Sequence, residues 1–121
     1  MLDSLKARMA ALPGVATCKI GLEDAIAPED YPILRLVPSR ASRGEAERRK
    51  MDVLIYFGAP ILAVEEGGVE AVYRALFALE GAIIAALSPG DGWRAKYVKT
   101  ITDEDRIETY KLMVVRCEVE G

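Results

Sequence analysis

The chain has 121 residues, which is enough for one folded domain and too few for two of ordinary size. Apolar residues make up 51% of it, yet no apolar run reaches the roughly 20 residues that a membrane-spanning helix needs. The net charge of −3 argues against a dedicated nucleic-acid-binding protein, which would be basic overall. We therefore expect a single domain over residues 1–121 that has no contact with membranes.

The sequence contains no histidine. Histidine is the usual acid–base group near neutral pH and the commonest metal ligand. Its absence excludes Ser-His-Asp and Cys-His catalytic arrangements and most zinc sites, but it leaves carboxylate catalysis and oxygen-ligated cations open. Cys18 and Cys117 have no CxxC neighbour and are expected to be free, half-buried thiols. We expect a protein that is not an enzyme and that holds no cofactor and no metal.

The first half of the chain predicts one helix and three strands. Apolar residues recur at helical spacing over residues 2–12, and Pro13 with Gly14 ends that helix. No apolar segment typical of a signal peptide is present there, which favours a cytoplasmic location. Runs rich in β-branched and aromatic residues predict strands at 15–20, 31–37 (YPILRLV) and 51–58 (MDVLIYFG).

A polar segment, SRASRGEAERRK, separates the second and third of these strands. It holds five basic residues against two acidic ones, the basic residues being Arg40, Arg43, Arg48, Arg49 and Lys50. We interpret residues 39–50 as the exposed loop of an antiparallel hairpin. Docking to another protein and transient contact with DNA remain alternatives. The loop has no aromatic residue to stack bases, and its single glycine provides no phosphate cradle.

A long helix is predicted over residues 68–87, and it carries two apolar stripes. The first stripe recurs at helical spacing and suffices to cover a sheet; it consists of Val69, Val72, Leu76, Leu79, Ile83 and Leu87. The second stripe, Tyr73, Phe77 and Ile84, widens the apolar arc beyond what a sheet requires. A contiguous apolar surface of this kind marks an interface, unless another part of the same chain covers it.

The chain closes with two strands, at 93–101 and 109–119, joined by the acidic turn TDEDRIE. Asp103, Glu104, Asp105 and Glu108 in and after this turn are oxygen ligands of the kind that Ca²⁺ and Mg²⁺ prefer. Their spacing is not that of an EF-hand loop, and Arg106 among them would oppose a cation. A solvated turn is therefore the favoured interpretation, and the same holds for the acidic residues of segment 23–30.

These elements follow the order α-β-β-β-α-β-β. Consecutive hairpins favour an α+β domain of two layers, with a mostly antiparallel or mixed sheet of about five strands and both helices on one face.

The layout also resembles a known family. A short helix before an LPG break, the proline-flanked strand YPILRLVP, a long polar hairpin, MDVLIYFG, one long helix and a closing strand, ETYKLMVVRCEV, cover nearly the whole chain. This arrangement resembles the tail terminator, or tail completion, proteins of long-tailed bacteriophages, of the minor-tail-protein-U type, and the related head–tail joining proteins. No catalytic motif carries the resemblance.

The resemblance implies a structural virion protein. Such a protein forms a homo-oligomeric ring, typically a hexamer, which caps the finished tail tube, ends its polymerisation and provides the surface for head attachment. Its partners would be further copies of itself, the tail tube protein and the head–tail connector protein, while DNA passes through the channel without being read. It would lie in the cytoplasm of the bacterial host during assembly and in the virion tail afterwards.

Under this interpretation the function resides in surfaces rather than in a catalytic site. The basic segment 39–50 would project towards the tube or a neighbouring subunit. The acidic loops around Glu23 to Asp30 and Asp103 to Glu108, the latter with Glu104 and Asp105, would meet basic patches on adjacent copies. Three alternatives stay open: a head–tail adaptor or other oligomeric α+β module, a nucleic-acid-handling accessory protein using the basic segment, and a small enzyme using the carboxylates of the acidic turn.

Overall fold

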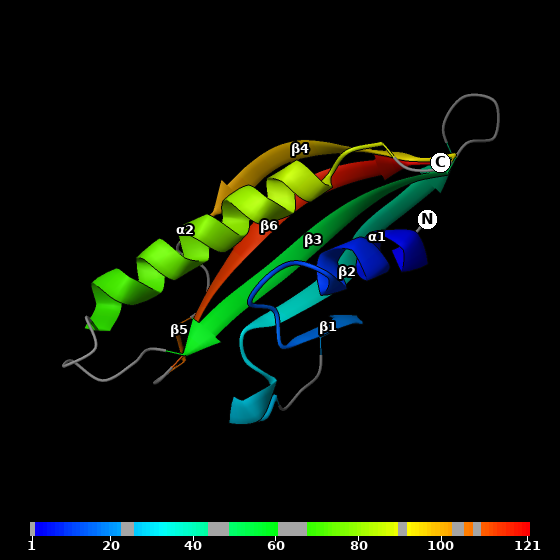
Figure 1. The fold of residues 1–121 in the computed structure, drawn as a ribbon. Helices are drawn as coiled ribbons and strands as arrows, with labels where there is room; N and C mark the ends of the chain where they lie inside the picture. Colours follow the sequence, from blue (N-terminus) through cyan, green and yellow to red (C-terminus); the bar gives the residue numbers. More distant parts are fainter. Residues whose placement is uncertain are drawn as a thin grey trace.

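A computed structural model describes residues 2–22, 26–43, 49–60, 68–89, 92–102, 106–107 and 110–121. Its helical elements are α1 (Leu2–Ala10), the short 3-10 helix η1 (Pro28–Asp30) and α2 (Gly68–Ala86). Its strands are β1 (Thr17–Ile20), β2 (Ile33–Arg43), β3 (Arg49–Pro60), β4 (Arg94–Ile101), β5 (Arg106–Ile107) and β6 (Tyr110–Glu120). Apart from η1 and β5, this is the predicted order of elements, and α1 and α2 lie on one face of a sheet (Figure 1).

The sheet is mixed. Its strand order is β1-β2-β3-β6-β4, with β5 pairing to β6. β1 pairs with β2 in parallel, with Cys18 opposite Leu34, whereas every other pairing among the described strands is antiparallel. The expectation that consecutive strands form hairpins is therefore wrong for β1 and β2. The segment 21–32 between them, which includes η1, is long enough to return the chain to the starting end of β1 before β2 begins.

The β2–β3 hairpin is longer than predicted. Much of the segment interpreted as a loop is strand, because β2 continues through Arg43 and β3 begins at Arg49. Pro38 interrupts β2 only locally, as a bulge shifts the register between Pro38 and Arg40. The paired residues of β1 reach only as far as Leu36, so Pro38 lies where β2 is an edge strand and its missing amide donor leaves no partner unpaired.

The core lies between the sheet and the two helices. Alternate residues of β3 and β6 point towards the helices and are fully buried, among them Val53, Ile55, Phe57, Met113, Val115 and Val119. α1 contributes Leu5 and Met9, and α2 contributes Val72, Leu76, Ile83 and Leu87. The first predicted stripe of α2 thus covers the sheet wherever its side chains are described.

Polar contacts join α1 to the C-terminal end of α2. Arg8 Nη1 donates to the carbonyl oxygen of Ala86 at 3.2 Å and to Ser88 Oγ at 3.0 Å. Its guanidinium also lies 4.8 Å from the centroid of the Trp93 ring. Trp93 is buried, and its Nε1 donates to Ser4 Oγ at 3.2 Å. A cation at the last turn of α2 satisfies terminal carbonyls and opposes the negative end of the helix dipole.

The face of the sheet opposite the helices is buried at one end only. Ile33, Arg35, Leu112 and Val114 are buried there. Arg35 is fully buried, and its Nη1 donates to the carbonyl oxygens of Thr17 at 3.1 Å and Leu34 at 2.9 Å. It therefore holds β1 against β2. In the described part of the chain, neither α1 nor α2 has the length and apolar character needed to cross a membrane.

Candidate interaction surfaces

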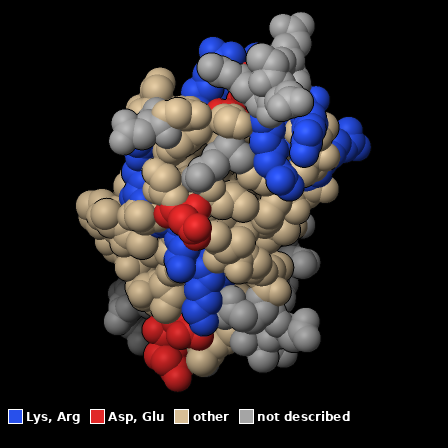
Figure 2. Space-filling model, turned by 90° about the vertical axis from the view of Figure 1, so that its right-hand side faces the viewer, with Lys and Arg blue, Asp and Glu red and all other residues tan. Residues whose placement is uncertain are grey.

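The basic segment forms the end of the β2–β3 hairpin. Arg43 lies directly opposite Arg49, Ser42 opposite Lys50, and Arg40 opposite Asp52, all of them on exposed or half-exposed positions. Figure 2 shows Lys and Arg gathered at the top of the molecule, the end at which β2 and β3 form this hairpin. The long strands thus carry these cations to one end of the sheet.

The two facing arginines have no compensation within the described residues. Like charges directly across an antiparallel pair repel each other. Arg43 and Arg49 form no ion pair in the part of the chain that the structure describes, and neither does Lys50. A hairpin that keeps such a pair exposed is suited to contact an acidic surface or an anion.

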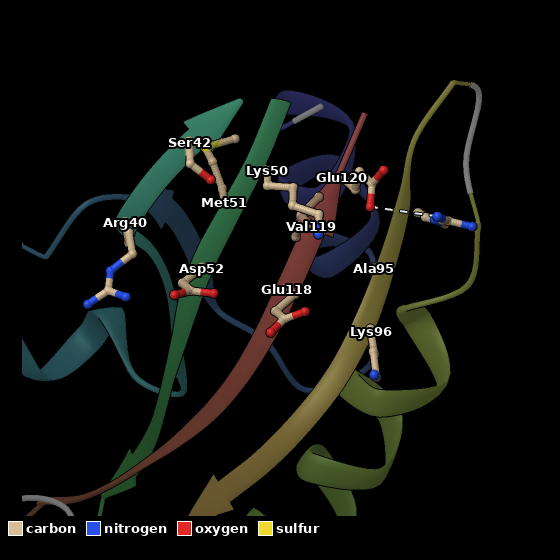
Figure 3. Close-up of a pocket in the computed structure, with 11 residues that line it drawn as sticks. Arg40, Ser42, Lys50, Met51, Asp52, Ala95, Lys96, Glu118, Val119 and Glu120 are labelled. Atoms are coloured by element: carbon tan, nitrogen blue, oxygen red, sulfur yellow. Dashed lines mark ion pairs between the residues drawn. The ribbon is translucent and has the colours of Figure 1, made fainter. Parts of the chain in front are cut away.

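Next to the end of this hairpin, a groove of about 470 Å³ lies on the face of the sheet that points away from the helices, and β2, β3, β6 and β4 line it (Figure 3). Two rows of charged residues cross the strands there: Arg40, Asp52, Glu118 and Lys96 in one, and Lys50, Glu120 and Arg94 in the other. Arg94 pairs with Glu120 at 3.6 Å. Because each row contains residues of both signs, the groove suits the polar surface of a protein better than a single small ion.

The second predicted stripe of α2 is exposed. Tyr73 is 37% exposed and Phe77 is 47% exposed, whereas Ile84 is half-buried. The rings of Tyr73 and Phe77 stack on each other, with centroids 6.4 Å apart and planes at 27°. The sequence left open whether another part of the same chain covers this second stripe. Among the described residues α1 does not cover Tyr73 and Phe77, because α1 packs beside the other end of α2 (Figure 1). Within the described part of the chain, Tyr73 and Phe77 therefore stay exposed.

The structure therefore separates the predicted site residues into two groups. Arg40, Arg43, Arg49 and Lys50 lie together on the hairpin, and Tyr73 and Phe77 lie in the half of α2 that is far from it (Figure 1). Arg48, Asp103, Glu104 and Asp105 lie outside the described residues. So do Glu23, Asp24 and Glu108 of the two acidic segments. In the described part of the chain, no three His, Cys, Asp or Glu residues lie close enough together to hold a metal ion.

Sequence reasoning missed Arg35 and the charged rows of the groove. Nothing in the pattern YPILRLV distinguishes a buried arginine from an exposed one. The rows arise from strand register, which brings Asp52 opposite Glu118 from segments far apart in the chain. One available signal was the alternation of charged and apolar residues along MDVL and RCEVE, which assigns these charges to a single face.

Both cysteines are free thiols, Cys18 half-buried and Cys117 fully buried. Burial, with a smaller contribution from Asp52, raises the pKa of Cys117 to about 12. Burial also raises the pKa of Cys18, although Arg35 and Lys6 act in the opposite direction. A raised pKa keeps a thiol protonated near neutral pH, where it is a poor nucleophile, so these thiols are suited to packing rather than to covalent catalysis.

A comparison with known protein families and with curated proteins finds no match to this sequence.

Proposed function

We propose that this protein is a structural component of a long-tailed bacteriophage that self-associates into a ring and caps the tail tube. The observation that carries the proposal is the exposed, stacked pair Tyr73 and Phe77, which lies beside the stripe of α2 that packs on the sheet. Two aromatic side chains with no cover among the described residues are typical anchors of a protein–protein interface.

The arrangement of elements supports the particular class. A short helix, a proline-containing strand, a long hairpin with a charged end, one long helix and a closing hairpin are the features on which the resemblance to tail terminators rests. The ring would end tail polymerisation and present a surface for head attachment. Its partners would be the tail tube protein and the head–tail connector protein, with the basic hairpin and the charged groove as contact surfaces. A head–tail adaptor of the same architecture is the nearest alternative.

The test is light scattering behind size exclusion over a range of protein concentrations, with negative-stain imaging of the large species. The proposal predicts rings of about six subunits, or a monomer that forms a ring on the end of isolated tail tubes. A matched variant, Tyr73→Ser with Phe77→Ser, should lose the ring, while Arg74→Ala on the same helix keeps it. A compact dimer at every concentration, or no binding to tube ends, would overturn the proposal.

A second candidate function rests on a different observation, the absence of ion pairs at Arg43, Arg49 and Lys50 within the described residues. A nucleic-acid-handling accessory protein would use these cations on phosphates. It predicts DNA binding that weakens steeply with salt, and Arg43→Ala with Arg49→Ala should reduce the slope of log K against log salt by about 2. Binding that is absent at low salt, or that does not change in the variant, rejects this candidate.

A further inference from the structure

A column of cations runs along β4 on the face of the sheet that points away from the helices. It consists of Arg94, Lys96 and Lys99, which lie opposite Glu120, Glu118 and Arg116 of β6. Lys96 and Lys99 share this face although they are three residues apart, because a bulge after Tyr97 inserts one extra residue into β4. The bulge therefore brings together two lysines that a regular strand would place on opposite faces.

Most of the cations on this face are not compensated by their neighbours. Arg94 pairs with Glu120 at 3.6 Å, and Arg116 pairs with Asp52 at 3.7 Å. Four further cations are exposed and form no ion pair within the described part of the chain, namely Arg40, Lys50, Lys96 and Lys99. One carboxylate, that of Glu118, is also exposed and unpaired among these residues. The face thus has an excess of positive charge in a chain whose net charge is −3.

Glu118 lies in the middle of this positive face. Asp52 and Lys96 lie on either side of it in the row that crosses the strands (Figure 3). Lys50 and Lys99 lie in the two neighbouring rows. From β2 to β4 each row extends over three strand spacings, which is about 14 Å. The cations therefore surround a carboxylate on a surface wide enough for several side chains of another molecule.

This arrangement fits a protein better than a nucleic acid. A nucleic-acid backbone presents phosphates alone, so it would bring negative charge onto Glu118 and Asp52 as well as onto the lysines. A protein surface can place carboxylates beside Lys96 and Lys99 and a basic side chain beside Glu118 in the same contact. Such a partner matches both signs of charge on this face.

We propose that this face binds an acidic surface of another protein, whose carboxylates lie beside Lys96 and Lys99 and which places one basic side chain beside Glu118. The inference deepens the proposed function, because it gives the chemistry of the partner that the charged groove contacts, and it rests on that function only for the identity of the partner. Charge complementarity of this kind sets register and partner choice more than affinity. The carboxylate of Glu118 within the positive face therefore decides which acidic surface binds.

Two fluorescently labelled peptides test the contact: a poly-glutamate peptide and the same peptide with its central residue changed to lysine. The wild type should bind the lysine-containing peptide at least as tightly as the poly-glutamate peptide, although the former carries less negative charge. Glu118→Gln should reverse this order, with a change of roughly 2–5-fold in each affinity. Lys96→Gln with Lys99→Gln should weaken the binding of both peptides by roughly 5-fold or more. Fluorescence anisotropy at low salt, where screening is weak, measures the affinities.

The matched control is Arg74→Gln, which removes an exposed cation on α2, away from this face, and should leave both affinities unchanged. Thermal unfolding verifies the fold of every variant. No binding of either peptide at low salt, or a wild type that prefers poly-glutamate, overturns the inference. A DNA duplex that binds more tightly than both peptides, and more tightly still to Glu118→Gln, overturns it as well.

Isolated tail tubes separate this inference from the proposed function. If the peptides bind as expected and the tubes do not bind, the inference stands and the proposed function fails. If the tubes bind equally well to the wild type, to Glu118→Gln and to the double lysine variant, the proposed function stands and the inference fails.

Discussion

The two surfaces of the central sheet are built from alternate residues of the same strands, and they differ in burial and in charge. On the helix side, Val53 and Ile55 of β3 are fully buried in the core. On the other side of the same strand, Asp52 is partly exposed in a charged groove and Leu54 is half-buried. Because side chains alternate along a strand, a slip of one residue would exchange the two surfaces, so the charges also help to fix the register. Stability should depend on one surface and recognition on the other.

The largest expected effect is in the core. Ile55→Ala should lower the free energy of unfolding by about 2–5 kcal/mol, because it removes buried methylene groups and leaves a cavity. Leu54→Ala, the neighbouring residue on the other surface, should cost clearly less. Denaturant unfolding followed by the fluorescence of Trp93, the single tryptophan, measures both. Equal losses for the two variants would contradict the division between the surfaces.

Arg35 is the exception on the charged side, because it is fully buried. Arg35→Ala should lower the free energy of unfolding by about 2–3 kcal/mol, since the carbonyl oxygen of Thr17 loses its donor and the buried side chain loses its packing. Arg35→Lys keeps the charge without the planar fork and should fall between the wild type and the alanine variant. Chemical denaturation gives the order. An alanine variant as stable as the wild type would mean that Arg35 does not hold β1 in place.

The contact between α1 and the end of α2 should matter less. Arg8→Ala removes the donors to Ala86 and Ser88 and the cation beside Trp93, and should cost about 1–2 kcal/mol. Arg74→Ala is the matched control, because its ion pair with Glu70 is exposed and of the i,i+4 type, worth a few tenths of a kcal/mol. Thermal melts at low and high salt compare them. If Arg8→Ala lowers the stability no more than Arg74→Ala does, the contacts of Arg8 do not stabilise the end of α2.

The same alternation explains how far the sequence could predict the structure. The elements, their order and the face that the helices cover could be predicted from periodic patterns, such as the strand pattern of MDVLIYFG and the helical pattern of residues 68–87. These patterns are local, so the sequence shows them directly. The parallel pairing of β1 with β2 was not predictable. No periodic pattern in the connecting segment shows whether it turns back at once or first returns the chain to the starting end of β1. The hairpin was predicted too short because charged residues in an edge strand resemble a loop.

The smallest effect on stability should come from the ion pair on the charged surface, between Arg116 and Asp52 at 3.7 Å. Arg116 is 39% exposed and Asp52 is 19% exposed, so solvent weakens their attraction. A double-mutant cycle with Asp52→Asn and Arg116→Gln should give a coupling of about 0.2–1 kcal/mol that falls as salt is added. If this surface serves recognition, the same two substitutions should change binding to tail tubes far more than they change the free energy of unfolding. A coupling of several kcal/mol would instead place this pair with the core, and the division between the two surfaces of the sheet would fail at its charged centre.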